Sequence, residues 1–207
     1  MAPARLHRTP PDLAPPIALH ERAEADLAFV RSVVERSTRF TAVPGVGGVL
    51  MGLTALGAAY LASRQPNRVA WLAVWLGEVV IAGVIGTVMM VRKARRANLP
   101  LGAGPSRRFA VGLMPPLVVG GVLTIAACRV EAWSLLPPIW LCCYGIAVLG
   151  AGAMSAAPVV PTMGAAFMLT GMLAVATPAA WGDVWLALAF GVAHIVSGIV
   201  IARHHGG

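Results

Sequence analysis

The sequence predicts an all-α integral membrane protein, a bundle of six transmembrane helices preceded by an N-terminal cytoplasmic amphipathic helix. Two observations predict this fold class. The chain is 58% hydrophobic and 12% charged, whereas a typical soluble domain contains roughly 25% charged residues. Most charges lie in the first forty residues and in one later segment, which leaves apolar stretches of the ~20 residues that a helix needs to cross a bilayer.

The N-terminal region divides into two parts. Residues 1–16 are rich in Pro, Ala and Arg without periodicity, so we expect a flexible tail. Residues 17–41 have apolar residues at helical spacing and charged residues on the other side; the apolar positions are Leu19, Ala23, Leu27, Val30 and Val34. The pattern predicts an amphipathic helix, which lies on the membrane or on its own bundle, or alternatively binds a partner. Residues 1–42 contain no uninterrupted apolar run, so no cleaved secretory signal is expected.

Six apolar stretches follow within residues 42–203. They predict transmembrane helices at about 43–62, 69–91, 109–127, 135–153, 159–177 and 184–202. Pro115 and Pro116 should kink the third helix, unless the helix begins there. Asp183 is expected to be the N-cap of the sixth helix, and residues 204–207 form a C-terminal tail.

The basic residues and tryptophans predict an orientation. With six spans, thirteen Lys and Arg residues fall on one side, and only Arg64, Arg68 and Arg129 fall on the other. Because Lys and Arg are retained in cytoplasmic loops, both termini are predicted to be cytoplasmic. All six tryptophans fall at the outer ends of the spans, as is typical of an interfacial belt. The excess of Arg over Lys, with abundant Ala, Gly and Pro, indicates a GC-rich bacterial source and hence the inner (plasma) membrane.

The net charge of +8 has an explanation without nucleic acid, because the basic residues lie beside spans and are not interleaved with aromatic residues. No nucleic-acid partner is therefore predicted. One basic cluster follows the second span and is predicted to contact lipid headgroups or a cytoplasmic partner; it consists of Arg92, Lys93, Arg95 and Arg96.

Metal and cofactor binding are not predicted. The three cysteines show no repeated ligand spacing, and a bis-histidine haem needs two membrane-embedded histidines, whereas only His194 lies in a span. The methionines of the fifth span, Met163, Met168 and Met172, have the spacing of packing residues in an apolar helix.

Small residues predict where helices approach closely. Gly48 and Gly52 form one stripe in the first span, and Ala187, Gly191 and Gly198 form another in the sixth. These stripes pack either within one bundle or between copies, so a homo-oligomer or a partner membrane subunit remains open.

Glu78 and His194 are the candidate site residues. Glu78 is the only acidic residue deep in a span, roughly 14 Å from the outer end of its helix, where a carboxylate costs about 2.5–3.5 kcal/mol. We therefore expect it to be protonated or to face a polar partner. His194 lies at nearly the same depth, so we hypothesise that the two meet near Thr54, Thr170 or Ser197. They would form a proton relay or a small polar binding site. The alternatives are a purely structural hydrogen bond and a neutral Glu78 that faces lipid.

Three resemblances bear on function. The stretch from Ala193 to Gly198 resembles the last helix of rhomboid proteases, in which a base His precedes small residues. The nucleophile motif of that family, Gly-x-Ser-Gly, has only the string Gly152-Ala153-Met154-Ser155-Ala156 as a counterpart, at the opposite end of its span. In size and span count the chain is similar to the substrate-binding subunits of energy-coupling-factor transporters. Its amphipathic helix, followed by Pro-Gly-Val-Gly-Gly, also resembles bacterial multi-pass membrane proteins.

These observations predict a non-enzymatic transporter subunit or membrane component with a mid-membrane polar site for a proton or a small polar solute. The alternative is a membrane sensor or assembly subunit that recruits a cytoplasmic partner through its N-terminal helix and basic cluster. An intramembrane hydrolase is the remote alternative, because no nucleophile accompanies the His.

Overall fold

The computed structural model describes residues 21–27, 29–30, 41–98, 104–153 and 155–205. The chain divides into two units, Met1–Ser37 and Thr38–Gly207. In the first unit, residues 21–27 and 29–30 are helical and exposed. The predicted tail at 1–16 and the rest of the amphipathic helix predicted at 17–41 lie outside the described residues, except for residue 41, which belongs to the second unit.

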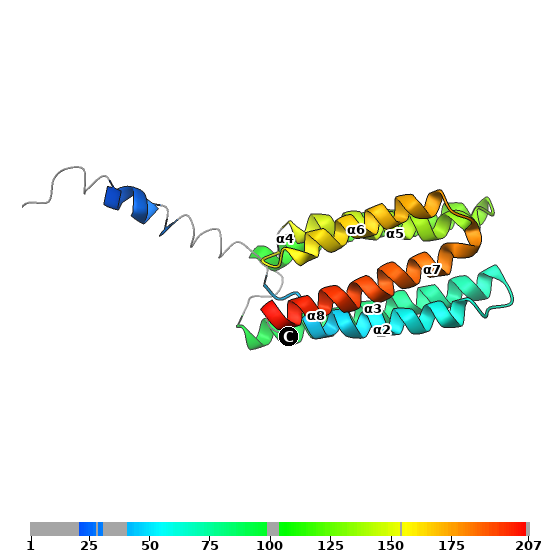
Figure 1. The fold of residues 1–207 in the computed structure, drawn as a ribbon, viewed down its shortest axis with the longest axis horizontal. Helices are drawn as coiled ribbons and strands as arrows, with labels where there is room; N and C mark the ends of the chain where they lie inside the picture. The colour runs from blue at the N-terminus through cyan, green and yellow to red at the C-terminus, as the bar shows by residue number, and fades with distance from the viewer. Residues whose placement is uncertain (1–20, 28, 31–40, 99–103, 154, 206–207) are drawn as a thin grey trace, which may run out of the picture. The chain divides into compact units, whose positions relative to one another are not determined.

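The second unit is helical, with no strand among its described residues. Two short 3₁₀ turns, η1 and η2, precede α5 and α7, and a π-helical turn, η3, joins α7 to α8. The elements, labelled as in Figure 1, are α2 (Gly45–Ala62), α3 (Arg68–Arg96), α4 (Gly104–Arg129), η1 (Trp133–Leu135), α5 (Leu136–Gly152), α6 (Val159–Val175), η2 (Ala179–Trp181), α7 (Gly182–Leu186), η3 (Ala187–Ala193) and α8 (His194–His205).

Five helical segments in the described chain are long and apolar enough to cross a membrane. They are Gly45–Ala62, Arg68–Arg96, Gly104–Arg129, Trp133–Gly152 and Ala179–His204. The remaining apolar helix, Val159–Val175, has 17 residues, which is the lower end of the usual range of roughly 17–25 residues for a span.

The helices of this unit pack in two layers (Figure 1). In one layer, α2 lies between α3 and the segment formed by α7, η3 and α8; in the other, α5 lies between α4 and α6. The segment of α7, η3 and α8 also contacts α6, and α7 contacts α5. This segment therefore joins the two layers and brings residues from both of them to the interior.

The two ends of the bundle differ in chemistry. At the end where α3 and α8 finish, here called the basic end, Lys93 donates a hydrogen bond to the carbonyl of Val43 over 3.0 Å. The other end, where α2, α4 and α6 finish, is here called the tryptophan end, because all six tryptophans lie in or near the segments that follow these helices in the sequence. The basic cluster at the end of α3 and the tryptophans, which are separate in the sequence, therefore lie at opposite ends of the bundle.

Glycines set the closest helix contacts. A Cβ atom on Gly198 of α8 would lie 2.6 Å from the carbonyl oxygen of Gly45 and from the amide nitrogen of Val49, both in α2. Similarly, a Cβ on Gly164 of α6 would lie 2.5 Å from the amide nitrogen of Leu149 in α5. The prediction that the stripes in the first and sixth spans permit close approach is confirmed, and these contacts are made within one chain.

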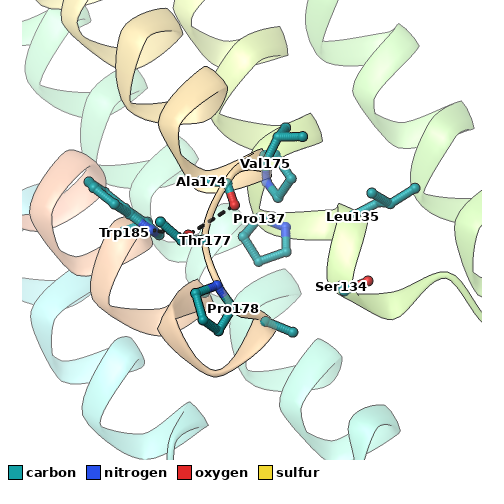
Figure 2. Close-up of a pocket in the computed structure, with 11 residues that line it drawn as sticks. Ser134, Leu135, Pro137, Ala174, Val175, Thr177, Pro178 and Trp185 are labelled. Atoms are coloured by element: carbon teal, nitrogen blue, oxygen red, sulfur yellow. Dashed lines mark hydrogen bonds between the residues drawn. The ribbon is translucent and has the colours of Figure 1, made fainter.

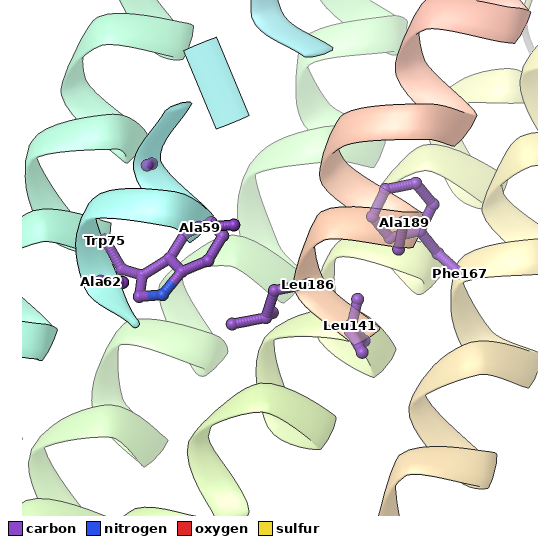
Figure 3. Close-up of a cluster of buried hydrophobic side chains, with 8 residues drawn as sticks. Ala59, Ala62, Trp75, Leu141, Phe167, Leu186 and Ala189 are labelled. Carbon is purple, nitrogen blue, oxygen red and sulfur yellow. The ribbon is translucent and has the colours of Figure 1, made fainter. Parts of the chain in front are cut away.

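The main core cluster lies toward the tryptophan end (Figure 3). It combines small residues of α2 with large side chains from both layers, and three of its members, Leu141, Phe167 and Leu186, are fully buried. The cluster consists of Ala58, Ala59, Ala62, Trp75, Leu141, Phe167, Leu186 and Ala189. Trp75 fills the space beside Ala59 and Ala62 that these small side chains leave.

Two features around the third predicted span differ from the expectation. The helix α3 continues through the basic cluster to Arg96, because Lys and Arg favour helix and complement the helix C-terminus. The helix α4 already begins at Gly104. The predicted spans end where charged residues begin, because charges are excluded from the hydrocarbon core. A helix can nevertheless continue beyond the hydrocarbon core. Pro115 and Pro116 lie inside α4, so the alternative that the helix begins at these residues is wrong.

Candidate functional site

Glu78 is buried between α3 and α2. Its side chain is 7% exposed, and the hydroxyl of Thr54 donates to its Oε1 over 2.8 Å. The Thr54 Oγ1 atom also lies 2.9 Å from the carbonyl oxygen of Met51 in its own helix. A threonine hydroxyl carries one proton, so it can satisfy only one of these acceptors at a time.

His194 is buried at the junction of η3 and α8. It is 4% exposed, and its Nε2 atom lies 2.7 Å from the hydroxyl oxygen of Tyr144 in α5. The other ring nitrogen, Nδ1, is buried and forms no hydrogen bond of acceptable geometry with the described residues, although the backbone of Ala189 and Phe190 lies beside the ring. Buried polar atoms without a partner are uncommon in folded proteins.

Aromatic rings surround this histidine. Phe190 lies almost parallel to the imidazole, with centroids 6.1 Å apart, and Phe167 meets it edge to face at 5.4 Å. Phe190 belongs to the π-helical turn η3. Such turns add one residue to a helix and are frequent at functional sites. The imidazole therefore lies among aromatic rings, with the hydroxyl of Tyr144 as the partner of its Nε2 atom.

The structure brings only some of the predicted site residues together. Glu78 and Thr54 form one pair and His194 and Tyr144 form another, with no hydrogen bond between Glu78 and His194. The hydroxyl of Thr170 instead donates to the carbonyl of Ala166 in its own helix over 2.7 Å. Ser197 is buried on α8, one turn beyond His194.

Tyr144 was missed by the sequence interpretation. It is one of only two tyrosines in the chain, and it lies in an apolar stretch, where a buried hydroxyl needs a hydrogen-bonding partner. That requirement was the signal that could have identified it as a partner for the histidine.

Asp183 was assigned the wrong role. The residue that precedes α7 is Trp181, without a side-chain cap, and Asp183 is the second residue of the helix. Its Oδ1 atom instead accepts the indole N–H groups of Trp71 at 2.8 Å and Trp75 at 3.1 Å. Trp71 also stacks on Trp140, with centroids 5.5 Å apart and planes at 6°. The carboxylate thereby holds α3 against α7 at the tryptophan end.

Two cavities open at the tryptophan end. The smaller, of about 200 Å³, lies beside Thr177, whose hydroxyl donates to the carbonyl of Ala174 and accepts the indole N–H of Trp185 (Figure 2). The larger, of about 320 Å³, has both charged and aromatic walls. Its polar and aromatic lining consists of Arg68, Trp71, Glu131, Trp133, Ser134 and Asp183.

The predicted headgroup residues lie at the basic end. Arg92, Arg95 and Arg96 are exposed, whereas Lys93 is half-buried and reaches back to the carbonyl of Val43. Three of the four side chains in this cluster are therefore oriented outward, while Lys93 fixes the end of α3 to the start of α2.

The two serines of the strings compared with rhomboid proteases are Ser155 and Ser197, and neither forms a hydrogen bond with His194. The hydroxyl of Ser155 accepts the backbone N–H of Ala157 over 3.1 Å, and the hydrogen bond of the imidazole goes to Tyr144. No group of three or more potential metal ligands occurs among the described residues.

Comparison of this chain with protein-family models, with curated proteins and with solved structures gave no match.

Proposed function

We propose that this protein is a non-enzymatic transporter subunit or membrane component whose buried polar pairs exchange a proton. It would lie in a bacterial inner membrane, with six spans and both termini in the cytoplasm. The observation that carries the proposal is the burial of Glu78 and His194 within a bundle whose helices present many large apolar side chains to their surroundings. Ionisable groups inside membrane helices are costly and mostly functional.

The helix that brings the number of spans to six in this proposal is α6, the fifth span in chain order. A Cβ on Gly152, at the end of α5, would lie 2.7 Å from the amide nitrogen of Pro161 near the start of α6. A Cβ on Gly171, near the end of α6, would lie 3.0 Å from the amide nitrogen of Cys142. Since α6 follows α5 between these points, it reaches about the same depth as α5, which supports counting it as a span.

A proton suits this interior better than a larger solute. Glu78 and His194 are buried, and neither lines one of the two cavities at the tryptophan end; a proton is a ligand that needs no cavity. In the pair of Glu78 and Thr54, a protonated carboxyl group can donate to the threonine hydroxyl while that hydroxyl donates to the carbonyl of Met51. Proton uptake would therefore need no movement of heavy atoms beyond hydrogen-bond rearrangement.

Glu78→Gln tests this proposal without a partner subunit. The infrared difference spectrum of the reconstituted protein between acidic and alkaline buffers reports the carbonyl stretch of a protonated carboxyl group. We expect the wild type to show one carboxyl signal that Glu78→Gln lacks and that Glu131→Gln, which changes an exposed carboxylate, retains. Identical spectra for wild type and Glu78→Gln throughout the folded range would show that Glu78 exchanges no proton.

The second candidate function is that of a membrane sensor or assembly subunit. The observation in its favour is the exposure of Arg92, Arg95 and Arg96 at the end of α3, where they are available to anionic headgroups or an acidic partner. Two separate variants test this function. In one, residues 1–40 are deleted; in the other, these three arginines are replaced by Gln. We expect loss of partner co-purification in both variants if this function holds, and retention in both if it does not.

A further inference from the structure

We propose that the larger cavity at the tryptophan end is a binding site for a small zwitterion. The ammonium group of the ligand would lie by Glu131, Asp183 and the indole rings, and its anionic group by Arg68. This proposal is independent of the buried pairs formed by Glu78 and His194, because the cavity contains neither of them.

The separation of opposite charges is the first argument. Arg68 and the two carboxylates line one cavity, yet Arg68 forms no ion pair with either Glu131 or Asp183 in the described structure. Charges of opposite sign that share a wall without neutralising each other leave both available to a ligand. A molecule that carries both signs fits between them better than a simple cation or anion.

The fixed position of Asp183 is the second argument. Both indole bonds end on its Oδ1 atom, so its Oδ2 atom is left for another donor. The two bonds and the helical position of the residue also hold the carboxylate in one orientation. A preorganised acceptor binds a ligand with a smaller loss of conformational entropy than a mobile one.

The position of Glu131 gives the third argument. It follows α4 at φ 57°, and the bonds from its amide to Cys128 and from Ala132 to Ala127 are those of a Schellman motif. Gly usually occupies this left-handed position. The motif fixes the backbone of Glu131, which lines the cavity, and so restricts where its exposed carboxylate can lie.

The indoles and the size of the cavity define the ligand further. The faces of Trp rings attract ammonium groups, and Trp71 is held in place by its stacking on Trp140. The volume of about 320 Å³ lies at the lower end of the roughly 300–1,000 Å³ typical of small-molecule sites. An ammonium group and a carboxylate or phosphate separated by a few bonds fit this space.

Two sources supply this chemistry, a free solute such as a betaine and the headgroup of a zwitterionic phospholipid. The test titrates the purified full-length protein in detergent with glycine betaine and with a short-chain phosphatidylethanolamine, and follows tryptophan fluorescence and calorimetric heat. Choline and acetate are the single-charge controls. We expect saturable binding of at least one zwitterion, about tenfold tighter than that of either control, as follows from one additional charge contact of about 1.4 kcal/mol. Binding of glycine betaine would identify a free solute as the source, and binding of the phosphatidylethanolamine would identify a lipid headgroup.

Arg68→Gln and Glu131→Gln should each weaken this binding about tenfold. Arg64→Gln is the matched control, because Arg64 lies near the same end but stacks on Tyr60 outside the cavity. All three side chains are exposed, so the variants should fold, which thermal unfolding checks. The proposal is overturned if no zwitterion binds saturably, if choline or acetate binds as tightly, or if Arg68→Gln and Glu131→Gln bind like the wild type.

Discussion

At the scale of single residues, Asp183 has the most specific structural role at the tryptophan end. One carboxylate oxygen satisfies the indole N–H groups of Trp71 and Trp75, and Trp75 is only 3% exposed. Hydrogen bonds to a charged acceptor are roughly twice as strong as neutral ones. The two hydrogen bonds therefore link α3 to α7, and the same residue lines the larger cavity.

Asp183→Ala is expected to destabilise the fold by about 2–3 kcal/mol, since it leaves the buried N–H of Trp75 without its acceptor. Asp183→Asn keeps an oxygen acceptor and should lose about half as much. Thermal unfolding in detergent, followed by the near-ultraviolet circular dichroism of the tryptophans, measures both. Equal stability of Asp183→Ala and wild type would mean that water or detergent satisfies the indoles instead.

Tyr144 is the second residue with a testable contact. Its hydroxyl is the hydrogen-bonding partner of the His194 Nε2 atom, so Tyr144→Phe leaves that buried nitrogen without its partner. We expect a loss of about 1–2 kcal/mol in the free energy of unfolding. Tyr60→Phe is the control, because Tyr60 is exposed, and a loss of the same size in both variants would contradict the role given to the bond.

At the scale of elements, glycines determine which helices pair. The contact between α2 and α8 brings Gly48 against Gly198, where a Cβ on Gly48 would lie 3.2 Å from the Cα of Gly198. Gly83 in α3, in contrast, has no atom within 4 Å of its added Cβ. Close approach of backbones increases dispersion contacts, which are a main source of helix association in lipid.

Gly198→Ala should therefore separate α8 from α2 and lower the unfolding temperature, because the new methyl group meets backbone atoms of Gly45 and Val49 rather than flexible side chains. Gly83→Ala should be neutral or stabilising by up to about 1 kcal/mol, the difference in helix propensity. Thermal unfolding of the two variants side by side tests the pairing. A smaller effect of Gly198→Ala than of Gly83→Ala would contradict it.

The same elements show what the sequence could and could not predict. The apolar stretches predicted helices near the observed ones because length and hydropathy are read along the chain. The buried polar residues Glu78 and His194 were identifiable for the same reason. Their partners were not, because the rotation of a helix depends on packing. Thr54 faces Glu78, while Thr170 bonds within its own helix, and no one-dimensional pattern separates these two threonines.

At the scale of the whole molecule, the second unit has a basic end and a tryptophan end. The side chains of Arg92, Arg95 and Arg96 are exposed at the first, and the second holds the indole bonds and both cavities. In a bilayer, basic residues favour the cytoplasmic side and tryptophans favour the interface. The cavities would then open toward the outer compartment, where solutes and the outer leaflet are accessible.

Cysteine labelling in intact cells tests this orientation. In a background with Cys128, Cys142 and Cys143 replaced by Ala, we expect a membrane-impermeant maleimide to label Arg64→Cys from outside and to label Ala97→Cys only after lysis. Both positions are exposed in the structure, so folding does not hide either of them. Only α3 separates the two positions among the apolar helices. Labelling of both from outside would therefore mean that α3 does not cross the membrane, and the reverse pattern would place the cavities on the cytoplasmic side.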